Sequence, residues 1–92
     1  MLPTTLDLDA IRCGQHRTCA GLDLEDADLQ HSNLAQSNFA GAVLVGANLR
    51  AANLKGARFE GANLLGADLA QVDGRATFLG ANLMQCNFEA AD

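Results

Sequence analysis

The chain has 92 residues and a mass of 9.6 kDa, which is enough for one small domain and too little for two. Six basic and eleven acidic residues give a net charge of −5, a balance that disfavours direct binding to nucleic-acid phosphates or to anionic membranes. No apolar run reaches the roughly 20 residues of a membrane span. The N-terminal residues lack the basic segment followed by an apolar stretch that marks a secretory signal, so a cytoplasmic protein is expected.

Residues 1–21 carry no repeat and are expected to form an N-terminal cap segment on the part of the chain that follows. Its apolar side chains would cover that part, while the other residues would face water. The apolar set is Leu6, Leu8 and Ile11, and the water-facing set is Pro3, Asp7 and Asp9.

Two cysteines of this segment, Cys13 and Cys19, lie six residues apart on either side of His16. A zinc site would need these three side chains and His31, but the spacing matches no common zinc pattern, so no metal is expected. A local disulfide would staple a small cap, yet disulfides are unusual in a cytosolic protein. Reduced thiols are therefore favoured, and the disulfide between Cys13 and Cys19 stays open.

From residue 22 onward a large apolar residue recurs at every fifth position, with a small residue two positions before it. The unit reads A-[N/D]-L-x-x, and Gly often closes it. Such self-similarity indicates a repeat architecture, so residues 22–92 are expected to form one repeat domain. The large residues are Leu24, Leu29, Leu34, Phe39, Leu44, Leu49, Leu54, Phe59, Leu64 and Leu69.

A period of five fits neither a helix nor a straight strand. On a helix each repeat would advance by about 140°, so no single buried stripe would form. On a straight strand, residues five apart face opposite sides. A short extended piece followed by a bend keeps every large residue on one side, so the chain must coil around a common axis. The small and the large residue of each unit then point inward, and the Asn or Asp between them points outward.

The phenylalanines indicate how many units complete one coil. Phe39 and Phe59 are 20 residues apart, and Phe78 follows 19 residues later. Four units per coil would stack these rings as an internal column, whereas three units per coil would not. The missing residue lies at positions 73–75, where Gly74 takes an inward position and a local dent is expected.

These units resemble the pentapeptide-repeat family over residues 22 to about 90. The resemblance implies an all-β fold, a right-handed quadrilateral parallel β-helix. With four units per coil, this gives about three and a half coils and an N-terminal cap over residues 1–21. Members of the family share a shape rather than a chemistry, so the resemblance implies no particular activity.

One column of outer positions is apolar where Asn and charged residues are otherwise the rule. It runs down the first face of the coils and is expected to contact a protein partner. The column reads Val45, Leu65 and Met84 after Glu25, with Val43 beside it. No cap follows Phe88, whose inward position would face water, so Phe88 is expected to belong to a contact surface as well.

Nothing in the pattern favours catalysis. Asp23 and Asp28 would be exposed on a convex surface rather than paired in a pocket. Ser32 and Ser37 are inward small residues without a His or Asp at a matching inward position. A non-enzymatic protein without a cofactor is therefore expected.

Two functions are weighed for such a scaffold. The first is a β-helical scaffold or protein-interaction module that associates with itself as a dimer, through the apolar column, the C-terminal end, or both. The alternative comes from the family, in which some members are similar to DNA in shape and charge and bind type II topoisomerases. The charge of −5 suits such mimicry in sign, but the acidic residues cluster at one end and basic residues interrupt the other faces.

Overall fold

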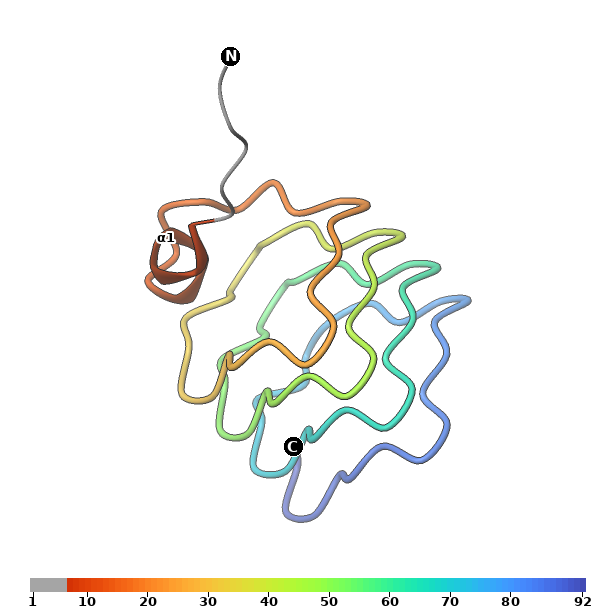
Figure 1. The fold of residues 1–92 in the computed structure, drawn as a ribbon. Helices are drawn as coiled ribbons and strands as arrows, with labels where there is room; N and C mark the ends of the chain where they lie inside the picture. Colours follow the sequence, from red (N-terminus) through yellow and green to blue (C-terminus); the bar gives the residue numbers. More distant parts are fainter. Residues whose placement is uncertain (1–6) are drawn as a thin grey trace.

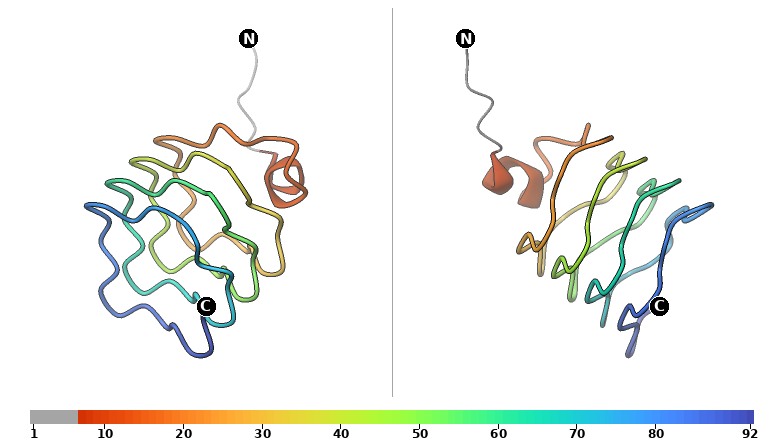
Figure 2. Two further views of the ribbon diagram at one scale, coloured as in Figure 1. Left: turned by 180° about the vertical axis from the view of Figure 1, so that it is seen from behind. Right: turned by 45° about the vertical axis from the view of Figure 1, so that its right-hand side comes forward.

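The computed structural model describes residues 7–92, in which one short helix precedes a stack of coils (Figure 1). The expected positions of Pro3 and Leu6 in the cap lie outside the described residues. Figure 2 shows the helix beside the first coil and the C-terminus on the last coil, at the opposite end of the stack. The helix therefore flanks one end of the stack, and the C-terminus lies at the other.

Helix α1 spans Leu8–Arg12 and begins at its own capping residue. The Asp7 side chain accepts a hydrogen bond from the Ala10 N–H at 3.1 Å, as an N-cap aspartate does. Ile11 is fully buried, whereas Asp7 and Asp9 are exposed. The all-β prediction is therefore wrong for the cap segment, because the Asp7 cap and the burial of Ile11 stabilise a helical turn there.

The rest of the chain returns over itself at a fixed interval. Parallel bridges link residues that are 20 positions apart as far as Asp73, and 19 positions apart beyond it. The pairing begins at Thr18, which bridges to Asn38, so the first coil starts inside the segment that the sequence assigns to the cap. Each bridge is isolated, because a turn follows every short extended piece and leaves no room for a long strand.

Backbone hydrogen bonds between coils follow one pattern, which the unit around Leu44 illustrates. The Leu44 N–H donates to the Asn63 carbonyl of the next coil at 2.7 Å, and the Gly46 N–H donates to the Leu65 carbonyl at 2.9 Å. In return, the Ala42 carbonyl accepts from the Asn63 N–H at 2.9 Å. Each unit thus presents two donors and one acceptor toward the C-terminal end, and two acceptors and one donor toward the N-terminal end.

A tight turn closes each unit. In one of them, the Leu49 carbonyl accepts from the Ala52 N–H at 3.0 Å, and Ala51 between them has a φ of 59°. A positive φ at the third residue is the mark of a type II turn, and Gly is the residue that adopts it without strain. Several units place a side chain there instead: Asp26, His31, Gln36, Ala51, Gln71, Gln85 and Ala90.

Ala51→Gly is expected to raise the free energy of unfolding by about 0.5–1 kcal/mol. Glycine removes a left-handed strain of about 1–2 kcal/mol, of which the more flexible unfolded chain offsets about 0.4–1 kcal/mol. Gly41→Ala is the matched control, because its added Cβ would meet nothing within 4 Å, so its change in stability reports the same two effects in the opposite direction without a steric clash. Urea melts followed by circular dichroism measure both changes. A less stable Ala51→Gly variant would contradict the turn type.

The inward positions form a continuous apolar core. The large residues of the units from Leu24 to Leu69 are at most 2 % exposed. Phe59 stacks on Phe39 with 5.0 Å between ring centroids and on Phe78 with 5.2 Å, the planes lying within 5° and 9° of parallel. The three rings thus form an internal column, the arrangement that their spacing predicts.

The register changes around Gly74, where the sequence places it. The Ala76 N–H donates to the Gly74 carbonyl at 2.6 Å, a tight local bend at the one-residue deletion. The Gly74 N–H donates to the Asp92 carbonyl at 2.9 Å, and the Asp92 N–H donates to the Val72 carbonyl at 3.0 Å. Asp92 therefore lies over the change of register, and the uncovered part of the final coil begins at Ala76.

Candidate interaction surface

The described chain brings together no side chains that resemble a metal centre. Within residues 7–92, no three His, Cys, Asp or Glu side chains lie close enough together to hold a metal ion. In the same part of the chain, no helix is long and apolar enough to cross a membrane.

All three cysteines are free thiols in the structure. Cys13 is exposed after α1, whereas Cys19 is buried at the inward position one unit before Leu24. Cys86 takes an inward small-residue position, with its Sγ 3.0 Å from the Leu64 carbonyl. Burial raises the pKa of Cys19 and that of Cys86, so both thiols stay protonated at neutral pH and pack as small apolar residues.

The acidic residues of the first coil serve its turns. Asp23 and Asp28 are exposed, and each carboxylate accepts a hydrogen bond from the N–H two positions later, at 3.2 and 3.3 Å. Asn residues make the same contact in later units, as Asn48 does with the Arg50 N–H at 3.0 Å. These carboxylates thus have a structural task, since short polar side chains stabilise turns in this way.

Farther along the stack, acidic residues pair with basic neighbours. The Arg75 guanidinium lies 2.7 Å from the Asp73 carboxylate, and that of Arg58 lies 3.4 Å from the Glu60 carboxylate. The hydrogen bond from Arg75 lowers the pKa of Asp73 to about 2. The excess of negative charge is therefore concentrated on the first coil.

Ser32 and Ser37 are buried inside the coils, at inward small-residue positions. The Ser32 hydroxyl donates to the Gln30 carbonyl at 3.5 Å, a long hydrogen bond. The Ser37 hydroxyl has no hydrogen-bond partner among residues 7–92. A buried hydroxyl without a partner destabilises the folded state.

Ser37→Ala is accordingly expected to raise the free energy of unfolding by about 1 kcal/mol, because it removes an unsatisfied buried hydroxyl and little volume. Ser32→Ala is the matched control and should change the stability less, since that hydroxyl retains a partner. Thermal melts of the three proteins measure the effect. A clear loss of stability in Ser37→Ala would show that the hydroxyl has a partner in solution.

The N-terminal end of the stack is covered by residues 7–17, and arginine side chains take part in the cover. The Arg12 Nη2 donates to the Gln30 carbonyl at 3.4 Å, and the Arg17 Nη1 donates to the Ala35 carbonyl. The Arg12 backbone carbonyl also accepts from the Asn33 N–H at 2.9 Å. In later coils the equivalent carbonyls accept hydrogen bonds from backbone N–H groups of the preceding coil. At the first coil the two guanidinium groups take the place of those N–H donors.

The C-terminal end has no such cover within the described chain. Three units of the final coil lack a following coil, and their outward-directed amides find no backbone acceptor in residues 7–92. These six donors are the N–H groups of Phe78, Gly80, Leu83, Gln85, Phe88 and Ala90. Three carbonyls at the same end, those of Ala76, Ala81 and Cys86, accept no backbone hydrogen bond from the described residues. Donors outnumber acceptors two to one here because each unit directs two N–H groups and one carbonyl toward this end.

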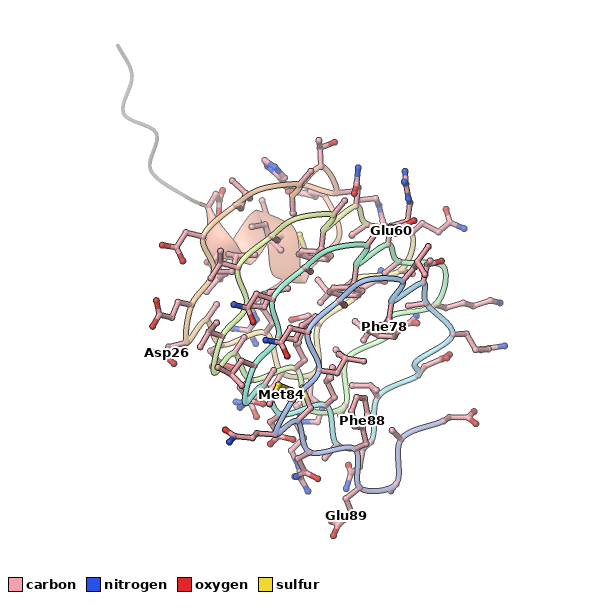
Figure 3. All side chains as sticks on the ribbon, turned by 90° about the vertical axis from the view of Figure 1, so that its right-hand side faces the viewer. Asp26, Glu60, Phe78, Met84, Phe88 and Glu89 are labelled. Carbon is pink, nitrogen blue, oxygen red and sulfur yellow. The ribbon has the colours of Figure 1, made fainter. Side chains whose placement is uncertain are left out.

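Exposed large apolar side chains gather on this same coil. Leu79 is 79 % exposed, Met84 65 % and Phe88 44 %, and these are the large apolar residues that the described chain exposes. Figure 3 shows Met84 and Phe88 on the side of the stack away from α1, near Glu89. All three belong to the final coil, Leu79 and Met84 on different faces of it, and exposed apolar side chains of this size are typical of a contact surface.

The apolar column of the first face leads to this cluster. The Gly46 N–H donates to the Leu65 carbonyl and the Gly66 N–H to the Met84 carbonyl, both at 2.9 Å, so Val45, Leu65 and Met84 follow one another along the stack. Val43, Val45 and Leu65 are half-buried, and exposure rises sharply only at Met84. The structure thus places the accessible part of the column at the final coil.

The repeats of this chain match those of a known protein family. The family model of pentapeptide repeats matches residues 23–61 and 52–89, with 8 copies of the repeat. No curated protein matches the sequence significantly.

Solved structures agree with the family match. A pentapeptide repeat protein of the Arabidopsis thaliana thylakoid lumen is 38% identical with a TM-score of 0.78, over 79% of this chain and 51% of that one. A pentapeptide repeat protein from Nostoc PCC 7120 is 31% identical with a TM-score of 0.50, over 82% of this chain and 67% of that one. The chain thus spans about half the length of the Arabidopsis protein. Pentapeptide repeat structures imply a right-handed β-helix, and this chain belongs to the pentapeptide-repeat family.

Proposed function

We propose that this protein is a non-catalytic β-helical interaction module that pairs with a second copy of itself through its final coil. In this proposal the repeats form a right-handed quadrilateral β-helix of about three and a half coils with an N-terminal cap. The four-unit coil is supported by the 20-residue interval of the bridges, and the cap by the burial of Ile11.

The distribution of exposed apolar surface carries the proposal. Leu79, Met84 and Phe88 all belong to the final coil, while the other end is covered by the chain's own residues 7–17. Covering three such side chains removes apolar area from water, which is the main driving force of association. A second copy supplies the same surface around a twofold axis, the commonest symmetry of small oligomers.

Side chains rather than backbone hold this proposed contact together. Two identical final coils meeting face to face would bring six amide donors against six amide donors. Few direct backbone hydrogen bonds can form between such edges, so the amides would bond water at the joint. The apolar side chains of Leu79, Met84 and Phe88 therefore account for most of the affinity.

Light scattering tests the proposal on the unmodified protein. Because one chain has a mass of 9.6 kDa, the expected mass is twice that value at high concentration and falls toward it on dilution. A mass that stays at the single-chain value at every concentration would exclude self-association by either surface.

Mimicry of DNA by a topoisomerase-binding protein receives less support. The acidic residues lie mainly on the first coil, and Arg50, Lys55, Arg58 and Arg75 interrupt the later coils. Duplex DNA carries one charge per roughly 1.7 Å along its whole length. A supercoiling assay with a type II topoisomerase and micromolar protein distinguishes the two functions, since the interaction module proposed here should leave the enzyme's rate unchanged.

A further inference from the structure

The hydrogen-bonding polarity of the stack points to a second kind of partner for the final coil. Every unit sends two N–H donors and one carbonyl toward the C-terminal end, as Leu44, Gly46 and Ala42 do. The uncovered edge of the final coil therefore holds six donors and three acceptors. The N-terminal edge of any coil of this kind holds the opposite ratio.

Only an edge with that opposite ratio satisfies all these groups at once. A second final coil offers donors where acceptors are needed, whereas a first coil of the same repeat offers two carbonyls and one amide per unit. Unsatisfied backbone groups at a contact are costly, so pairing them selects the partner. The edge is thus complementary in hydrogen bonding to the first coil of another β-helix stacked head to tail.

A second copy of this chain is prevented from supplying that first coil. Its residues 7–17 lie over the N-terminal end, with Ile11 fully buried against the coils. The Arg12 and Arg17 side chains already occupy the carbonyls of Gln30 and Ala35. The final coil of one copy and the first coil of another are therefore complementary in hydrogen bonding, but residues 7–17 block the first coil. This block stops the chain from forming endless head-to-tail fibres.

We infer that the final coil can also bind the uncovered first coil of a different pentapeptide-repeat chain, head to tail, and that residues 7–17 keep a second copy of this chain from binding in that head-to-tail arrangement. The inference shares its surface with the proposed function but not its partner or its hydrogen bonds. The partner must present an open first coil with Leu- or Phe-sized inward residues, which would cover Phe78, Leu83 and Phe88 as the next coil covers Phe59.

A variant of this chain can act as the probe for such a partner. Ile11→Asp places a charge at a buried position and releases the cover from the first coil, while Phe88→Lys blocks the final coil. The double variant I11D/F88K then presents only an acceptor-rich end. Mixed in excess with isotopically labelled wild type, it is expected to form a one-to-one complex in native mass spectrometry. Phe88→Lys alone, which keeps the cover, should form none.

Amide hydrogen exchange in the labelled wild type identifies the geometry. The six amides of Phe78, Gly80, Leu83, Gln85, Phe88 and Ala90 should exchange roughly tenfold more slowly, or slower still, with the probe than without it. Homodimerisation of the wild type is read from its mass alone, so failure of the proposed function and failure of this inference are separate results.

A second probe keeps the test decisive if Ile11→Asp does not fold. The double variant R17A/F88K leaves Ile11 in the core and vacates the Ala35 carbonyl, so it should bind wild type more weakly than I11D/F88K but more strongly than Phe88→Lys. Circular dichroism establishes which probes are folded. Absence of a mixed complex with every folded probe, or a complex without protection of the six amides, would overturn the inference.

Discussion

Phe59→Ala is expected to lower the free energy of unfolding by about 3–5 kcal/mol, the range for a large-to-small change in a closed core. Phe59 is fully buried, and both faces of its ring are stacked, on Phe39 at 5.0 Å and on Phe78 at 5.2 Å. Its removal would leave a cavity in the middle of the column. The backbone around that space cannot collapse into it, because the coil that carries Phe59 is hydrogen-bonded to the coil before it and to the coil after it.

Urea denaturation followed by circular dichroism measures this loss. Phe78→Ala is the matched control, because Phe78 stacks on one ring only and is half-buried. Its loss should be clearly smaller than that of Phe59→Ala. A loss below about 1 kcal/mol for Phe59→Ala would be incompatible with a buried ring of this kind.

Phe88→Lys is expected to convert the protein from dimer to monomer without unfolding it. Phe88 takes an inward position on the final coil and is 44 % exposed, so a lysine can extend into water when no second copy is present. In the proposed dimer two lysines would face one another at the joint, where burying like charges opposes association. Within residues 81–92 the charged side chains are Glu89 and Asp92, so the change adds a first positive charge to this segment.

Leu65→Lys is the matched variant on the first face, where Leu65 is half-buried in the middle of the apolar column. It should leave the dimer intact if the final coil is the contact. Sedimentation equilibrium of both variants decides between the two surfaces. Dissociation by Leu65→Lys together with a stable Phe88→Lys dimer would instead place the contact side by side along Val45, Leu65 and Met84.

The repeat made most of the fold predictable from the sequence. A five-residue period is incompatible with a helix and with a straight strand, so it left coiling as the one geometry that buries every large residue. The spacing of Phe39, Phe59 and Phe78 then fixed both the length of a coil and the place of the missing residue at Gly74. These inferences succeeded because each rests on many equivalent positions rather than on one.

The cap was less predictable because it repeats nothing. Five residues of α1 are too few to show a helical period, although Asp7 is a recognisable N-cap residue. The spacing of Cys13 and Cys19 favours reduced thiols and leaves a disulfide open, but it does not reveal that Cys19 occupies the inward position one unit before Leu24. The contacts of Arg12 and Arg17 with carbonyls depend on three-dimensional proximity that no sequence pattern announces.

The contact surface was predicted in part. Val43, Val45, Leu65 and Met84 share a face in the sequence pattern, but the pattern does not reveal that exposure rises only at the final coil. Leu79 was missed as a contact residue because it stands alone on its own face, after Ala40 and Glu60. The polarity of the two ends required the direction of each backbone hydrogen bond, which only the structure provides.

The central claim is that one end of the stack is covered and the other is open. Amide hydrogen exchange tests it most directly, on protein diluted until its mass is that of one chain. The amides of Leu44 and Leu49 in the middle coils, and that of Asn33, which donates to the Arg12 carbonyl beneath the first coil, should be protected. The six outward amides of the final coil, from Phe78 to Ala90, should exchange at rates close to those of an unfolded chain. Protection of those six amides equal to that of Leu44 in the single chain would contradict the account.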